Sequence, residues 1–121
     1  MAKSKILLAE DDVTMVALLK TLLKMEGFDV VALHADADVL AAARIEKPDA
    51  LLLDFHLASQ SGLDILDEIR GSQDINTLPV VMSSGANVKD ECLRRGASGF
   101  LLKPYMPDEL IVILKKAIKP V

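Results

Sequence analysis

Short apolar runs alternate with amphipathic stretches along the chain, and polar or glycine-containing segments separate them. Runs rich in Leu, Ile and Val predict five buried strands, at Lys5–Ala9, Phe28–Leu33, Ala50–Leu53, Val80–Met82 and Ser98–Leu102. Apolar positions at helical spacing predict five helices: one from Val13 to a cap at Gly27, one from Asp36 to about Glu46, then Leu63–Arg70, Val88–Arg95, and one from Pro107 to near Lys119. Such alternation with short loops predicts an α/β fold, a doubly wound parallel sheet with helices on both faces.

Length and charge narrow the class of protein. We expect a single domain spanning 1–121, with no room in this chain for an effector domain. The net charge of -4 disfavours direct nucleic-acid binding, and charged residues interrupt each apolar run, which predicts no membrane insertion. The N-terminus lacks a secretory signal and Cys92 is the single cysteine, so we expect a cytoplasmic protein.

Polar residues gather where the predicted strands end: Glu10, Asp11, Asp54, Ser84 and Lys103. The carboxyl ends of parallel strands share one edge, so these side chains should converge. Three carboxylates about 5 Å apart would repel by roughly 3 kcal/mol per pair at an effective dielectric near 20. A hard divalent cation with oxygen ligands would offset this, and Mg²⁺ fits the few carboxylates better than a Ca²⁺ cage.

Together, acids, a cation, Lys103 and the Ser84 hydroxyl suit phosphoryl transfer to a carboxylate. Asp54 is the candidate nucleophile because it directly follows the buried apolar run Ala50–Leu53, although an aspartate there could also serve as a turn cap. Asp12 can cap the first helix. We expect His34 and His56 to be solvated loop residues.

Four segments resemble the receiver domains of bacterial two-component response regulators, and at their spacing the resemblance extends over essentially the whole chain. They are Leu8–Asp12, Leu51–Asp54 followed by Gly62, Pro79–Ser84, and Gly96–Pro104. The resemblance implies strand order 2-1-3-4-5, the flavodoxin-like order of the chemotaxis regulator CheY. It also implies a cis bond between Lys103 and Pro104.

The resemblance further implies roles for single residues. Asp54 becomes the phosphoacceptor and a Mg²⁺ ligand with Asp11, while Glu10 acts through water and His56 contributes its main-chain carbonyl. The remaining residues with implied roles are the conserved lysine, the conserved hydroxyl and the aromatic switch, at Lys103, Ser84 and Phe100.

Two positions depart from the family pattern. Ala58 stands where many members have proline, which should loosen the loop after Asp54. Gly99 stands where transcription factors of the family usually place an acid for a dimer face. We therefore expect a monomer or a weak phosphorylation-dependent dimer.

The sequence thus predicts a signalling switch that assists its own phosphorylation and dephosphorylation, rather than an enzyme. A histidine kinase or a histidine phosphotransfer protein would donate the phosphoryl group. A downstream protein target or effector domain would recognise the changed surface of the fourth helix, fifth strand and fifth helix.

Three alternatives stay open: a phosphorylation-independent pseudo-receiver, a small phosphatase with an aspartate nucleophile, and a flavin or nucleotide binder. His56 stands where such a phosphatase would need a second acid, and no phosphate-binding glycine loop follows the first strand.

Overall fold

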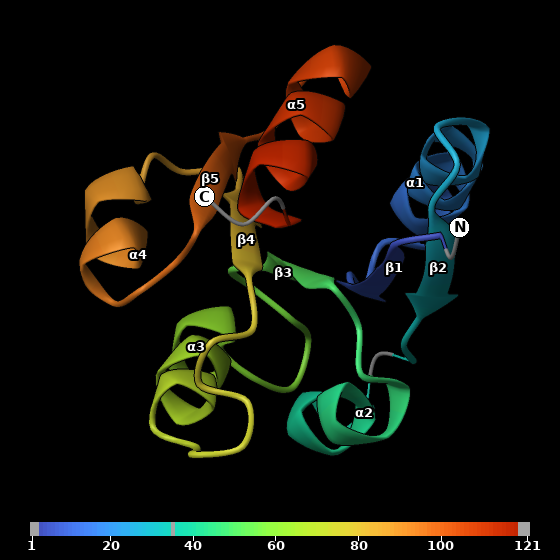
Figure 1. Cartoon of the computed structure of the whole chain (residues 1–121). Helices are drawn as coiled ribbons and strands as arrows, with labels where there is room; N and C mark the ends of the chain where they lie inside the picture. Colours follow the sequence, from blue (N-terminus) through green and yellow to red (C-terminus); the bar gives the residue numbers. More distant parts are fainter. Residues whose placement is uncertain (1–2, 35, 119–121) are drawn as a thin grey trace.

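A five-stranded parallel sheet lies between two layers of helices in a computed structural model that describes residues 3–34 and 36–118 (Figure 1). The elements of this described part are β1 (Lys5–Ala9), α1 (Val13–Met25), β2 (Asp29–Ala32), α2 (Val39–Glu46), β3 (Ala50–Asp54), α3 (Gly62–Arg70), β4 (Val80–Ser84), α4 (Lys89–Arg94), β5 (Gly99–Leu102) and α5 (Pro107–Ile118). The strand order is β2-β1-β3-β4-β5, and neighbouring strands are parallel. Both the doubly wound fold and the strand order are as predicted.

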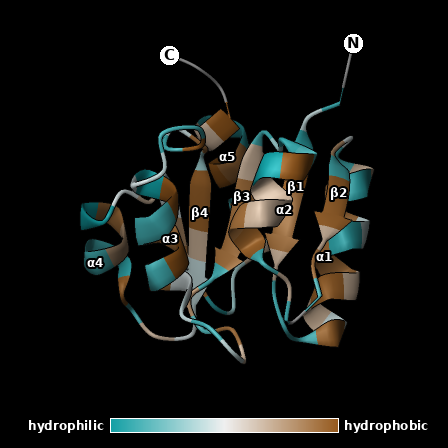
Figure 2. Ribbon diagram, turned by 90° about the horizontal axis from the view of Figure 1, so that it is seen from below, coloured by the Kyte–Doolittle hydropathy of each residue, from teal (hydrophilic) through white to brown (hydrophobic). Residues whose placement is uncertain are grey.

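The two faces of the sheet carry separate hydrophobic clusters. Helices α1 and α5 cover one face, and α2, α3 and α4 cover the other (Figure 1). Successive side chains of a strand point to opposite faces, so Leu7 joins the cluster under α2 and α3 while Leu8 joins the cluster under α1 and α5. The central strands are therefore apolar on both faces, as their colouring in Figure 2 shows.

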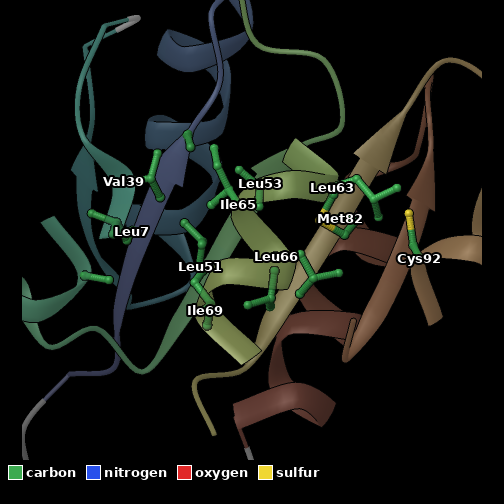
Figure 3. Close-up of a cluster of buried hydrophobic side chains, with 13 residues drawn as sticks. Leu7, Val39, Leu51, Leu53, Leu63, Ile65, Leu66, Ile69, Met82 and Cys92 are labelled. Atoms are coloured by element: carbon green, nitrogen blue, oxygen red, sulfur yellow. The ribbon is translucent and has the colours of Figure 1, made fainter. Parts of the chain in front are cut away.

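The cluster under α2, α3 and α4 extends across the sheet (Figure 3). Leu51 and Leu53 of β3 contribute from the centre, Leu66 from α3, and Cys92 from α4. Cys92 is fully buried, and burial together with the charge of Glu91 raises the pKa of its thiol. The single cysteine is thus a packed core residue.

Side-chain caps decide where several helices begin. The Asp12 carboxylate accepts hydrogen bonds from the backbone N–H groups of Thr14 and Met15 at 3.0 and 3.2 Å, as expected of a cap of α1. The prediction that the second helix begins at Asp36 is wrong. α2 begins at Val39, because the Asp38 side chain accepts a hydrogen bond from the backbone N–H of Ala41.

The strand ends differ from the predicted ends by one or two residues. β4 continues past Met82 to Ser84, because Ser83 pairs with Asp54 and Ser84 pairs with Leu102 in the parallel ladders. β2 is shorter than predicted by one residue at each end. Lys119, expected near the end of the last helix, lies outside the described residues.

No helix in the described ranges combines the length and the apolar character needed to cross a membrane.

Candidate functional site

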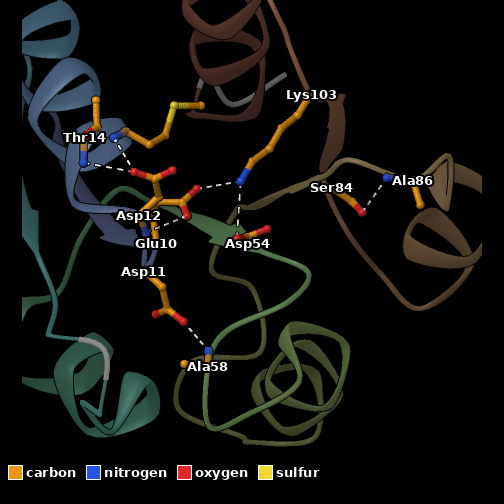
Figure 4. Close-up of polar contacts among 10 residues, drawn as sticks. Glu10, Asp11, Asp12, Thr14, Asp54, Ala58, Ser84, Ala86 and Lys103 are labelled. Carbon is orange, nitrogen blue, oxygen red and sulfur yellow. Dashed lines mark hydrogen bonds and ion pairs between the residues drawn. The ribbon is translucent and has the colours of Figure 1, made fainter.

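The carboxyl edge of the sheet brings three predicted site residues into contact. Glu10 follows β1, Asp54 ends β3, and Lys103 follows β5. The Lys103 ammonium nitrogen lies 2.7 Å from Glu10 Oε1 and 3.3 Å from Asp54 Oδ2 (Figure 4). One cation therefore bridges two carboxylates that are 93 and 49 residues from it in the sequence. The bond between Lys103 and Pro104 is cis, as the resemblance implied.

This ionic cluster is largely withdrawn from solvent. The side chains of Glu10 and Asp54 are 5% and 11% exposed, and that of Lys103 is 24% exposed. Burial, followed by the charge of Glu10, raises the pKa of Asp54 above its ordinary value even though Lys103 opposes the shift. Burial alone would lower the pKa of Lys103, but Glu10 and Asp54 outweigh it and raise that pKa.

The three consecutive acids after β1 have three different partners. Glu10 pairs with Lys103 and also accepts a hydrogen bond from the backbone N–H of Asp12 at 3.2 Å. Asp12 caps α1. Asp11 Oδ2 accepts a hydrogen bond from the backbone N–H of Ala58, in the loop after β3. The sequence run of acids therefore does not form one uniform cluster.

Asp11 Oδ1 is a buried oxygen with no hydrogen-bond partner among the described residues. A buried acceptor without a donor is unfavourable, and an added cation would satisfy it. The oxygens of Glu10, Asp11 and Asp54 form the donor chemistry that Mg²⁺ prefers, so these residues fit the ion. Within residues 3–34 and 36–118, however, no three His, Cys, Asp or Glu side chains are already arranged to hold a metal.

Ser84 lies near this edge, but its hydroxyl points elsewhere. The side chain is buried, and its oxygen accepts a hydrogen bond from the backbone N–H of Ala86 at 3.1 Å (Figure 4). The Ser84 carbonyl accepts a hydrogen bond from the backbone N–H of Lys103 at 2.8 Å, which ties β4 to the segment after β5. The structure thus places Ser84 at the same edge as the ionic cluster, with its hydroxyl bound to Ala86 rather than to Asp54.

Phe100 and His56 occupy different environments. Phe100 of β5 is half-buried and packs against the cluster that contains Cys92. His56 is exposed, with its ring edge against the ring of Phe55 at a centroid distance of 4.9 Å. His34 is exposed as well, so both histidines are solvated as expected.

Two features of the site were missed by the sequence patterns. Tyr105 is half-buried against the cluster under α1 and α5, and burial, followed by the charges of Glu10 and Asp54, raises the pKa of its phenol. The backbone of Ala58 contacts Asp11, whereas the sequence indicated only a looser loop. The position of Tyr105 two residues after Lys103 was the available signal for the first feature, and no side-chain pattern signals the second.

A glycine makes the end of β3 possible. The backbone N–H of Gly62 donates to the Phe55 carbonyl at 2.8 Å, and a Cβ at position 62 would overlap the carbonyl oxygen of Asp54. The loop that follows Asp54 can therefore close only around a residue without a side chain.

Residues 6–115 match the response regulator receiver domain family. The chain belongs to this family, whose module is the receiver of two-component signalling.

Curated relatives and solved structures agree with this assignment. The chain is 28% identical over 120 residues to the DNA-binding response regulator MtrA of Mycolicibacterium paratuberculosis, a match of 97% of this chain and 52% of the relative. It is 34% identical over 118 residues to the transcriptional regulatory protein CpxR of Klebsiella pneumoniae, a match of 96% of this chain and 50% of the relative. The chain thus spans about half the length of these relatives.

A solved structure adds an observation about metal. The receiver domain of the sensor histidine kinase PA1611 from Pseudomonas aeruginosa superimposes with a TM-score of 0.80 and 28% identity, covering 97% of this chain and 98% of that one. That structure has a magnesium ion coordinated in its active site cleft.

Proposed function

We propose that this chain takes a phosphoryl group from a histidine kinase or a histidine phosphotransfer protein onto Asp54, in a Mg²⁺-dependent reaction, and signals that state to a protein partner. The observation that carries the proposal is the bridge that Lys103 makes to Glu10 and Asp54, at 2.7 and 3.3 Å, on the carboxyl edge of a receiver domain. A buried carboxylate beside a cation is the arrangement that phosphoryl transfer to aspartate requires.

Four residues would hold the ion. Asp11 and Asp54 would be direct ligands, the main-chain carbonyl of His56 a third, and Glu10 would act through water. When bound, Mg²⁺ neutralises charge on the phosphoryl oxygens and orients them. The buried oxygen of Asp11 that lacks a donor supports this assignment.

In the transfer step, a carboxylate oxygen of Asp54 attacks the phosphorus of a phosphohistidine. A P–O bond forms as the P–N bond breaks, and the electron pair leaves with the imidazole nitrogen, which then takes up a proton. The Lys103 ammonium lies where it can exchange its contact with Asp54 for one with a phosphoryl oxygen. Hydrolysis of the aspartyl phosphate by water returns the carboxylate.

Phosphorylation would then change a surface distant from Asp54. The Ser84 hydroxyl would release the backbone N–H of Ala86 and donate a hydrogen bond to a phosphoryl oxygen. Phe100 would move inward. A shift from 1:99 to 99:1 between two states takes about 5.5 kcal/mol of differential stabilisation, to which new charge-assisted hydrogen bonds would contribute. Leu93 of α4, Leu102 of β5 and Met106, directly before α5, are exposed at 41%, 47% and 62%, which suits recognition of this region by a protein.

The same proposal covers the setting in which the domain acts. Its target is a downstream protein or an effector domain, it makes no direct nucleic-acid contact, and it works in the cytoplasm as a monomer or a weak phosphorylation-dependent dimer. At Gly99, a Cβ would lie 2.6 Å from Ile113 Cδ1 of α5, so this chain packs α5 where other members place an acid. That packing supports a weak rather than a tight dimer.

Incubation with acetyl phosphate and Mg²⁺, followed by intact-mass measurement, tests the proposal. We expect the mass of one added phosphoryl group in the wild-type protein, and none with a chelator or in Asp54→Asn. Asp74→Asn is the matched control, because Asp74 is also paired with a cation but lies 58% exposed away from the site. Labelling of Asp54→Asn at the wild-type level would remove Asp54 from its role. A wild-type protein that takes no label would favour the pseudo-receiver, and sustained turnover of p-nitrophenyl phosphate would favour the phosphatase.

A further inference from the structure

Asp11 is held differently from the other two acids of the site. Lys103 contacts Glu10 and Asp54, whereas no ion pair to Asp11 is found among the described residues. The Asp11 carboxylate instead turns toward the loop after β3, where its Oδ2 accepts the backbone N–H of Ala58 (Figure 4). Its other oxygen is buried without a donor. The contact therefore satisfies Oδ2 of the carboxylate and leaves Oδ1 without a hydrogen bond.

The loop presents this N–H from a backbone that is already closed. The backbone N–H of Leu57 donates to the Gln60 carbonyl at 3.2 Å, and His56 and Ser61 form a bridge across the loop. Gly62 then donates to Phe55. These bonds fix the loop without help from Asp11, so the Ala58 N–H is a pre-positioned donor that captures the carboxylate.

Capture of Asp11 has a consequence for cation binding. The acids at this edge are of the right kind for Mg²⁺, yet no three of the described acids, histidines or cysteines are arranged to hold a metal. In Figure 4 the carboxylate of Asp11 is directed away from Lys103 and toward Ala58. Since no three of these groups surround a common point while Asp11 is bound to Ala58, an ion shared by Asp11 and Asp54 must draw the Asp11 carboxylate away from the loop.

We propose that the backbone N–H of Ala58 is a latch that holds Asp11 out of the cation site, so that residue 58 sets the affinity of the domain for Mg²⁺. This inference rests on the proposed function and adds a control on cation loading to it. When only a fraction of the molecules have a site that can bind the ion, the apparent affinity is the intrinsic affinity multiplied by that fraction. The latch acts through the main chain, so every residue except proline retains it, because proline has no N–H.

Two changes at position 58 remove the donor in different ways. Ala58→Pro removes the N–H with a natural residue, and replacement of Ala58 by lactic acid turns the amide into an ester while keeping the methyl group. Ala58→Gly is the matched control, since it removes the side chain and keeps the N–H. Isothermal titration calorimetry with MgCl₂ then measures the dissociation constant of each metal-free protein.

We expect the dissociation constant for Mg²⁺ to fall about 3- to 10-fold in both donor-free proteins, the range that one hydrogen bond supplies. Ala58→Gly should stay within about twofold of the wild type. In the wild-type protein, the amide hydrogen of Ala58 should exchange more slowly without Mg²⁺ than with saturating Mg²⁺, measured by NMR.

Equal or weaker Mg²⁺ binding by the ester protein would overturn the latch, and the ester decides the matter if Ala58→Pro does not fold. An Ala58 amide that exchanges equally fast in both states would overturn it as well. The proposed function fails in a different way, when the wild-type protein neither binds Mg²⁺ nor becomes phosphorylated at Asp54.

Discussion

The two edges of the sheet both carry ion pairs, but they hold them differently. At the carboxyl edge, Lys103 pairs with Glu10 at 2.7 Å, and the two side chains are 24% and 5% exposed. At the opposite edge, Arg44 pairs with Asp74 at 2.8 Å, and the two side chains are 45% and 58% exposed. The distances are nearly equal, so distance does not distinguish the buried pair from the exposed pair. Exposure does.

The pKa values of two aspartates, one at each edge, shift in opposite directions. Asp54 and Asp74 each have a cationic partner. The hydrogen bond from Arg44 lowers the pKa of Asp74, whereas burial and Glu10 raise the pKa of Asp54 despite Lys103. The charge of Asp54 is thus unfavourable for the folded state, and the charge of Asp74 is favourable. A domain keeps an unfavourable buried charge where chemistry needs it.

The largest loss of stability is expected at Gly62, at the start of α3, and Gly71, just after the end of the helix, serves as its comparison. Gly62→Ala, at the carboxyl edge, would force a Cβ into the Asp54 carbonyl oxygen and should lower the free energy of unfolding by about 2 to 3 kcal/mol. Gly71→Ala, at the other end of the helix, places its Cβ at an ordinary 3.4 Å from the Asp67 carbonyl and should change stability by less than about 1 kcal/mol. Urea denaturation measures both, and equal losses would contradict the close approach at Gly62.

A smaller effect is expected when the cation of each pair is removed. Lys103→Met leaves two buried acids facing each other and should cost about 1 to 2 kcal/mol at pH 7, because Lys103 is partly exposed. Arg44→Met removes an exposed pair and should cost less than about 0.5 kcal/mol. Chemical denaturation measures the free energy of unfolding of both variants. A larger loss in Arg44→Met than in Lys103→Met would contradict the difference between the two edges.

The smallest effect is the dependence of stability on pH at the two aspartates. Because the pKa of Asp54 is raised in the folded state, Asp54→Asn should be at least as stable as the wild type at pH 7, and its advantage should shrink as acid protonates the buried carboxyl. Because the pKa of Asp74 is lowered in the folded state, Asp74→Asn should be slightly less stable at pH 7. Its deficit should begin to shrink below the unfolded-state pKa near about 3.9 and should disappear once the pH has fallen through the lower folded-state pKa. Thermal melts at pH 7, 5, 4 and 3 test the two effects, which should be opposite in sign at pH 7.

The sequence predicted the architecture because hydrophobic periodicity carries it. It did not predict the start of α2 or the end of β4, since those depend on whether Asp38 reaches the N–H of Ala41 and on whether the ladder extends to Ser84. Such ends are decided by single hydrogen bonds.

The candidate site was also predictable only in part. The meeting of Glu10, Asp54 and Lys103 follows from a parallel sheet, whose strand ends share an edge. The directions of Asp11 and Ser84 were not predictable, because each side chain is held by a loop amide, at Ala58 and Ala86. Nearly every residue type offers such an amide, so no sequence pattern marks it.

Tyr105 has a practical consequence for watching this domain at work. The sequence contains one tyrosine and no tryptophan, so the intrinsic ultraviolet emission of the protein comes chiefly from this one phenol. It packs against the core under α1 and α5 and lies within the electrostatic reach of Glu10 and Asp54. Events that alter the charge near Tyr105 can therefore be followed by tyrosine fluorescence in the unlabelled protein. Tyr105→Phe, which lacks this emission, is the control.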